Sequence, residues 1–179
     1  KQIASHLGGV RQGMCVSWPG HIKDTGAVRS QFHHMIDVVP TILEAAGIRQ
    51  PDEVDGIKQS PIEGVSFAYT FDAKNANASS THKTQYFEMM GDHSIYHEGW
   101  LASTKVIRSP WDVVGAVNPD PFNNVTWELY DLTKDYSQAT DIAAQNPEKL
   151  AEMKALFAQE ARKYQVLLLD ASVATRLLG

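Results

Sequence analysis

The stretch that decides the fold is 84–107, which runs Thr84-Gln85-Tyr86-Phe87-Glu88-Met89-Met90-Gly91-Asp92-His93-Ser94-Ile95-Tyr96-His97-Glu98-Gly99-Trp100-Leu101-Ala102-Ser103-Thr104-Lys105-Val106-Ile107. It contains three short β-like runs, 84–89, 94–97 and 100–107, and a fourth follows at 127–132 after a loop at 110–126. Consecutive short runs joined by tight turns are typical of antiparallel strands. The sequence therefore predicts a small antiparallel sheet.

The clearest helix follows this sheet at 147–165. Asn146 is a good cap, Pro147 suits the first helical position, and Glu148 suits the positive helix start. Apolar residues recur on one face at helical spacing: Leu150, Met153, Phe157, Ala161 and Tyr164. We expect this helix to pack on one face of the sheet.

Two elements are predicted before the sheet. The apolar run 13–18 is bounded by Gly-Gly and Pro-Gly, which predicts a buried strand in a covered sheet and makes Cys15 a small buried side chain. A helix is expected from Asp37, which can cap the first amides, to Gly47, which can end it. Its apolar residues share one face: Ile36, Val39, Ile42, Leu43 and Ala46.

The chain is expected to divide at the polar stretch 74–83, because 49–83 lacks sustained periodicity. This predicts a first part, 1–73, with a strand, a helix and a long connection. The linker 74–83 separates it from a sheet subdomain, 84–179. The tail 166–179 is apolar, and we expect it to continue into more protein.

Composition excludes several classes of protein. With 43% hydrophobic and 21% charged residues, the 179-residue chain resembles an ordinary globular protein. A net charge of -5 without a dense cationic run argues against a nucleic-acid partner. No apolar run approaches the roughly 20 residues that span a bilayer, so no membrane segment is expected. A single cysteine excludes an internal disulfide.

Taken in order along the chain, several short motifs resemble the C-terminal portion of a type I sulfatase, in particular the larger bacterial arylsulfatases. They are Lys1 before Gly8-Gly9-Val10-Arg11, the run that leads to Trp18-Pro19, Ile36-Asp37-Val38-Val39-Pro40-Thr41, Glu44-Ala45-Ala46-Gly47, Asp55-Gly56, Trp127-Glu128-Leu129-Tyr130-Asp131-Leu132 and Asp141-Ile142-Ala143. The resemblance spans nearly the whole chain.

The resemblance implies a fragment of an α/β fold of the alkaline-phosphatase-like kind, with 1–73 as the end of the large mixed-sheet domain. It implies hydrolysis of small aryl-type sulfate esters by a formylglycine nucleophile with bound calcium. The Cys/Ser-x-Pro-x-Arg motif that yields formylglycine is absent from residues 1–179, and Cys15 does not fit it. The family's calcium ligands also lie upstream of this chain. We therefore expect the fragment alone to be inactive, with the remainder of the sulfatase chain as its partner and a periplasmic or secreted parent.

Three residues are candidates for the sulfate-binding site. By resemblance, Lys1 is the lysine before the Gly-Gly turn that neutralises charge developing on the sulfate; the alternative is an exposed terminal side chain. His6 is either a second anion contact or proton donor, or a histidine with a structural hydrogen bond. The structural role is favoured, because a lone histidine is not specific to a catalytic site. Arg11 binds an anion through its fork of donors, or makes a structural ion pair.

The other histidines give no metal site. His33 and His34 are adjacent and point to different faces, and His93 and His97 flank a predicted hairpin without a carboxylate partner. Two alternative functions stay open. One is a phosphonate monoester hydrolase or phosphodiesterase of the same superfamily, and the other is a non-catalytic interaction domain.

Overall fold

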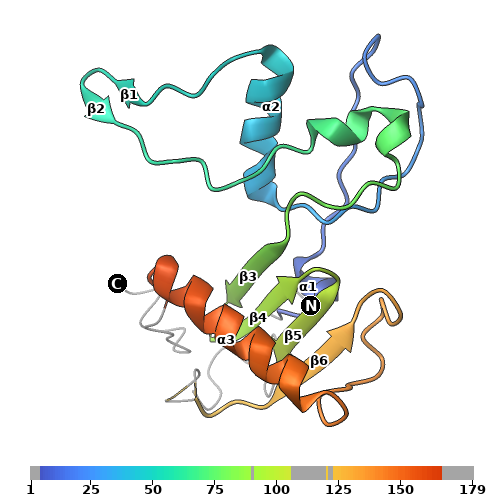
Figure 1. Ribbon diagram of the computed structural model, residues 1–179, viewed down its shortest axis with the longest axis vertical. Helices are drawn as coiled ribbons and strands as arrows, with labels where there is room; N and C mark the ends of the chain where they lie inside the picture. Colours follow the sequence, from blue (N-terminus) through green and yellow to red (C-terminus); the bar gives the residue numbers. More distant parts are fainter. Residues whose placement is uncertain (1–4, 90, 106–119, 121–122, 167–179) are drawn as a thin grey trace. The chain divides into compact units, whose positions relative to one another are not determined.

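The computed structural model describes residues 5–89, 91–105, 120 and 123–166 (Figure 1). They form two compact units. Unit 1 combines Lys1–Gly13 with Thr84–Gly179, and unit 2 is Met14–Lys83. The predicted tail and most of the predicted loop 110–126 lie outside the described residues.

Unit 1 is built on a four-stranded antiparallel sheet, as predicted. Its strands follow one another in space in chain order: β3 Thr84–Met89, β4 Asp92–His97, β5 Trp100–Thr104 and β6 Trp127–Asp131. The turn between β4 and β5 has positive φ at Glu98 and Gly99, 45° and 88°, the conformation that suits a two-residue hairpin. Leu101 then lies opposite Tyr130, which fixes the register of β5 on β6.

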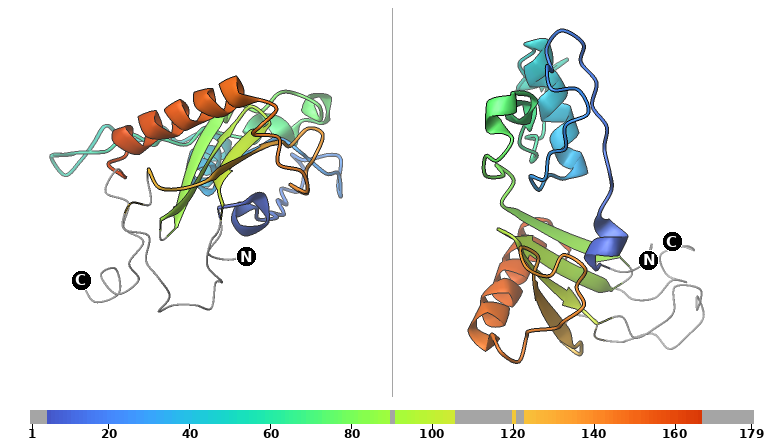
Figure 2. Two further views of the ribbon diagram at one scale, coloured as in Figure 1. Left: turned by 90° about the horizontal axis from the view of Figure 1, so that it is seen from below. Right: turned by 90° about the vertical axis from the view of Figure 1, so that its right-hand side faces the viewer.

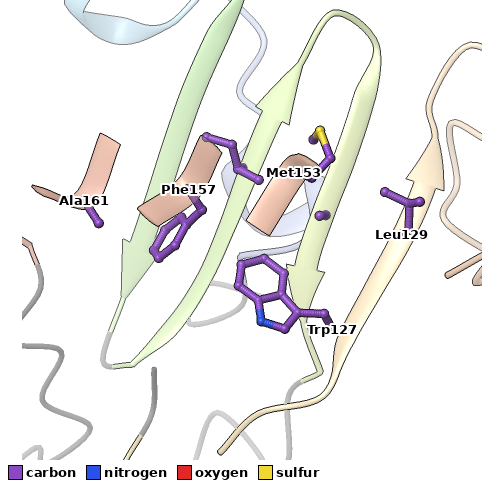
Figure 3. Packing of buried hydrophobic residues seen from close by; sticks show 7 residues of the cluster. Trp127, Leu129, Met153, Phe157 and Ala161 are labelled. Carbon is purple, nitrogen blue, oxygen red and sulfur yellow. The ribbon is translucent and has the colours of Figure 1, made fainter. Parts of the chain in front are cut away.

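Helix α3, Pro147–Lys163, covers one face of this sheet (Figures 2 and 3), which confirms the predicted packing. Alternate strand residues point toward it, because side chains in a strand have a period of two. The shared core consists of Ile95, Ala102, Trp127, Leu129, Met153, Phe157 and Ala161. Two of the helix residues, Met153 and Phe157, are 0% and 1% exposed. The helix ends two residues before the predicted 165, and Gln165 has a φ of 58°.

The opposite face of the sheet carries the segment that begins at Ser5. The short helix α1, Leu7–Val10, lies on this side (Figure 2). The Ser94 hydroxyl of β4 donates a hydrogen bond to the Ser5 carbonyl, with 2.7 Å between the oxygens, and Ser5 is buried. Residues 5–13 therefore belong with the sheet. The assignment of 1–73 to a large catalytic domain stays a prediction.

Unit 2 is organised around α2, Val38–Ala46, which follows the 3-10 turn η1, Met35–Asp37. The helix ends at Gly47, as predicted, because the φ of 66° there is the left-handed conformation that glycine adopts without a steric penalty. A small hairpin pairs β1, Glu53–Val54, with β2, Ile57–Lys58. Two further 3-10 turns follow, η2 Ala68–Phe71 and η3 Ala73–Asn75. No described helix has the length and apolar character required to cross a membrane.

The predicted buried strand at 13–18 is wrong. These residues form no strand, and Cys15, predicted to be buried, is exposed together with Met14 and Val16. A buried strand needs hydrogen-bonded neighbours and covered faces, and the described part of unit 2 supplies neither to this segment.

Helix α2 buries a face other than its apolar one. Val39 and Ile42 are 53% and 60% exposed, whereas Asp37 and Thr41 are buried. The Thr41 hydroxyl donates to the Asp37 carbonyl at 2.6 Å and accepts from the Phe67 amide at 3.0 Å. These two hydrogen bonds attach the segment that carries Phe67 to this helix.

Gly64 permits the close approach of that segment. A Cβ at this position would lie 2.1 Å from the Ile36 carbonyl oxygen and 2.6 Å from its carbon, both backbone atoms. We expect Gly64→Ala to lower the free energy of unfolding by ~1–3 kcal/mol, because the backbone must shift. Thermal melting measures the loss. Gly13→Ala is the control, since a Cβ there meets nothing within 4 Å; equal melting temperatures for the two variants would contradict the expected clash.

His93 makes unit 1 sensitive to acid. Burial lowers its pKa below the ordinary 6.5, and the ring stacks on Phe157 with a 4.5 Å centroid separation. As the pH falls, His93 therefore becomes protonated in the unfolded chain at a higher pH than in the folded chain. Stability is present above pH 6.5 and falls below it, by up to ~1.4 kcal/mol per pH unit. We expect His93→Phe to reduce the loss of unfolding free energy between pH 7.5 and 5.5, as measured by urea unfolding. His97→Gln, on the same strand but more exposed, is expected to retain it, and an unchanged slope in His93→Phe would refute the assignment.

Candidate functional site

The candidate site is the N-terminal turn of unit 1, which carries two of the three predicted sulfate-binding residues. His6 precedes helix α1 and Arg11 follows it. The turn closes through hydrogen bonds from the Gly9 amide to the His6 carbonyl and from the Arg11 amide to the Leu7 carbonyl, each 2.8 Å. Lys1, the third predicted residue, lies outside the described residues.

Glu128 holds the side chain of His6. The His6 Nε2 atom lies 2.8 Å from the Glu128 Oε2 atom, and the side chains are 25% and 16% exposed. The Tyr130 hydroxyl donates to the same oxygen at 3.0 Å. Burial first, and then its hydrogen bond to Glu128, raises the pKa of Tyr130, so the phenol stays a donor at neutral pH. This geometry supports the structural interpretation of His6, while its contact with sulfate stays a prediction.

Two further contacts hold the backbone on either side of His6. The Leu7 amide donates to the Gln138 Oε1 atom at 2.6 Å, and the Ser5 carbonyl accepts from Ser94. Gln138 has a φ of 57°, a conformation uncommon for residues other than glycine. The 5–7 segment is therefore attached to β4, to β6 and to the loop that follows β6.

Arg11 packs on an aromatic ring. Its guanidinium carbon lies 4.7 Å from the ring centroid of Tyr136, which is 53% exposed. A cation over a ring face at this distance is attracted by the ring quadrupole. The predicted contact of Arg11 with an anion is not tested by this arrangement, which orients the guanidinium beside the N-terminal turn.

Sequence reasoning missed Glu128, Tyr130, Tyr136 and Gln138. The sequence predicts a strand at 127–132 but no candidate site residue in it. The alternation of Trp127 and Leu129 with Glu128 and Tyr130 was the available signal, because it puts an acid and a phenol on the face away from α3. That this face receives the N-terminal turn, 122 residues earlier in the sequence, had no local signature.

A second polar cluster lies in unit 2, around the buried carboxylate of Asp37. His82 Nδ1 lies 2.9 and 2.8 Å from its two oxygens, and His33 Nδ1 lies 3.0 Å from Oδ2. The backbone amides of His34 and Val65 donate to Oδ2 and Oδ1, each at 2.8 Å. Burial opposes ionisation, but these hydrogen bonds outweigh it and hold the pKa of Asp37 well below its ordinary value. His82 comes from the predicted linker 74–83, so that stretch takes part in this cluster.

Neither cluster fits a calcium ion. Calcium takes roughly six to eight oxygen ligands, whereas both oxygens of Asp37 already face hydrogen-bond donors. In the ranges the structure describes, no group of three or more His, Cys, Asp or Glu side chains is arranged to hold a metal. His93 and His97 have separate partners, since His93 contacts the Gly91 carbonyl and His97 contacts Thr84.

Comparison with known proteins identifies the family to which most of this chain belongs. Residues 6–165 match the family model of the C-terminal region of N-sulphoglucosamine sulphohydrolase. The chain is 28% identical to arylsulfatase K from Xenopus laevis over 120 residues, which is 66% of this chain and 20% of that protein. The chain thus spans about a fifth of the length of this curated relative.

Solved structures show the same fold. The crystal structure of Ps i-CgsB superposes with a TM-score of 0.58 at 20% identity, covering 89% of this chain and 31% of that one. The structure of BT4656 in complex with its substrate D-glucosamine-2-N,6-O-disulfate gives a TM-score of 0.53 at 20% identity, covering 86% and 28%. The two units therefore have the architecture of a sulfatase C-terminal region. The chain belongs to the N-sulphoglucosamine sulphohydrolase C-terminal family of sulfatases.

The Asp37 cluster is expected to be essential for the stability of unit 2. Asp37→Asn removes a buried charge that four donors surround, and we expect a loss of ~3–5 kcal/mol, seen as early thermal unfolding. Because the pKa of Asp37 is lowered, its contribution is present above the unfolded value of 3.8 and falls as the pH drops below it. Asp52→Asn is the control, since its side chain is 92% exposed. Equal stability of the two variants would rule out this role.

Proposed function

We propose that the chain is the C-terminal region of an enzyme that hydrolyses sulfate esters. The observation that carries this proposal is the family match across residues 6–165. In this proposal a formylglycine nucleophile and a bound calcium ion belong to the part of the enzyme that the match does not cover. The chain spans 20% of arylsulfatase K and 31% of the Ps i-CgsB chain, which leaves most of a sulfatase to supply them.

The surface of unit 2 supports a large partner within the same enzyme. Large apolar side chains are exposed along it: Met14, Val16, Val28, Met35, Ile36, Val39, Ile42, Ile48, Val54, Ile57 and Val65. Exposed apolar side chains in this number are typical of a surface that another structure covers. We propose that the remainder of the sulfatase chain covers them, with a mixed sheet of the alkaline-phosphatase-like kind against the α2 face that Val39 and Ile42 occupy.

The proposed roles of the site residues follow from their charge. Lys1 and Arg11 are cations that balance the negative charge of a sulfate group as the ester bond breaks, and His6 is a further anion contact. The BT4656 structure holds a disulfated glucosamine, which extends the proposed substrates from aryl sulfates to sulfated sugars.

The expected test uses the complete enzyme and the isolated chain with 4-nitrophenyl sulfate and a matching phosphonate monoester, both with calcium. We expect the complete enzyme to turn over the sulfate ester and residues 1–179 to be inactive, because the nucleophile motif is absent from them. Lys1→Ala in the complete enzyme is expected to lower kcat/KM by ~10²–10³-fold, as for loss of one charge-stabilising donor.

The outcomes separate the alternatives. Preference for the phosphonate ester would indicate a phosphonate hydrolase of the same superfamily. Robust sulfate turnover by the isolated chain would contradict the placement of the nucleophile elsewhere. Strong binding of a hydrophobic dye by the folded chain is expected from the exposed side chains of unit 2, whereas weak binding would favour a self-contained interaction domain.

A further inference from the structure

We propose that Glu128 is a positioning residue for His6: its carboxylate fixes the orientation of the imidazole and accepts the Nε2 proton, so that in the protonated ring the Nδ1–H is the donor turned to the sulfate ester. This inference rests on the proposed function, because it assigns His6 a contact with the substrate. Glu128 itself acts through His6.

The first argument is the geometry of the Glu128 carboxylate. Its Oε2 atom lies 2.8 Å from His6 Nε2 and 3.0 Å from the Tyr130 hydroxyl, which donates to it. An ionised carboxylate only accepts hydrogen bonds, so a hydrogen bond at this distance requires the imidazole proton on Nε2. A partner on one ring nitrogen selects the tautomer and leaves the other nitrogen for chemistry.

The second argument is rigidity. Glu128 lies on the edge strand β6, at the centre of its five residues, and pairs with Ser103 of β5. Its neighbours Trp127 and Leu129 are fixed in the core beneath α3. The carboxylate therefore projects from a supported strand, and groups on such elements hold a functional side chain more accurately than loop residues do.

The third argument is that the backbone around His6 is held independently of its ring. Ser94 binds the Ser5 carbonyl at 2.7 Å, and Gln138 binds the Leu7 amide at 2.6 Å. With the main chain attached on both sides, the side-chain contact with Glu128 is not required to fold the turn. Its specific effect is to choose the rotation and the tautomer of the ring.

Two measurements test the proposal. In the 179-residue chain, ¹⁵N NMR of the His6 imidazole is expected to show one neutral tautomer, protonated on Nε2. Glu128→Gln is expected to give a mixture, because an amide can both donate and accept. In the complete enzyme, Glu128→Gln is expected to lower kcat for 4-nitrophenyl sulfate by ~10–100-fold with a smaller change in KM, as for loss of a residue that orients a ligand side chain.

Glu152→Gln is the matched control, because it makes the same chemical change in an exposed residue of α3 whose Lys149 pair lies at the surface. It is expected to keep the wild-type tautomer and rate. A wild-type protein whose neutral His6 ring is protonated on Nδ1, or a Glu128→Gln enzyme with unchanged kcat, overturns the positioning role. Absence of sulfate turnover in the wild-type complete enzyme instead overturns the proposed function, and the tautomer measurement still reports on the contact.

Discussion

The structure of unit 1 depends on the two-residue period of β6. One set of its side chains, Trp127 and Leu129, completes the apolar core under α3. The other set faces the N-terminal turn, where Glu128 binds His6 and Tyr130 donates a hydrogen bond to Glu128. Because a shift of one residue exchanges the two faces of a strand, the register of β6 on β5 sets the core and the candidate site together. Neither can be altered by a register change without loss of the other.

Unit 2 is stabilised by a different kind of interaction. Its most buried contacts are those of Asp37, whose carboxylate accepts from backbone and imidazole donors and joins the start of α2 to the segments that carry Val65 and His82. A buried charge is tolerated when hydrogen bonds replace the water it has lost. Unit 2 is thus organised by a polar centre, while its apolar side chains lie largely at the surface.

Local sequence patterns predicted where helices and strands occur, but not which residues pack around them. The antiparallel strands, the helix that begins at Pro147 and the end of α2 at Gly47 follow from alternation, capping and turn chemistry, all of which act over a few residues. The strand predicted at 13–18 failed because burial depends on neighbours that the apolar run does not specify. Asp37 was predicted as a helix cap, but its contact with His82 joins residues 45 positions apart. Likewise, His6 was a candidate from the sequence and Glu128 was not, because only the fold brings them together.

The distance along the chain between His6 and Glu128 has a consequence for biosynthesis. The two residues are separated by 122 positions, so the N-terminal turn is made early and its partner late. During synthesis from the N-terminus, domains fold as their parts emerge, and contacts of long sequence separation form slowly. The contact of Ser5 with β4 can form first, but the His6 side chain remains without its Glu128 partner until β6 has left the ribosome. The candidate site is then among the last parts of unit 1 to be assembled. The contact between His6 and Glu128 forms only once β6 is present.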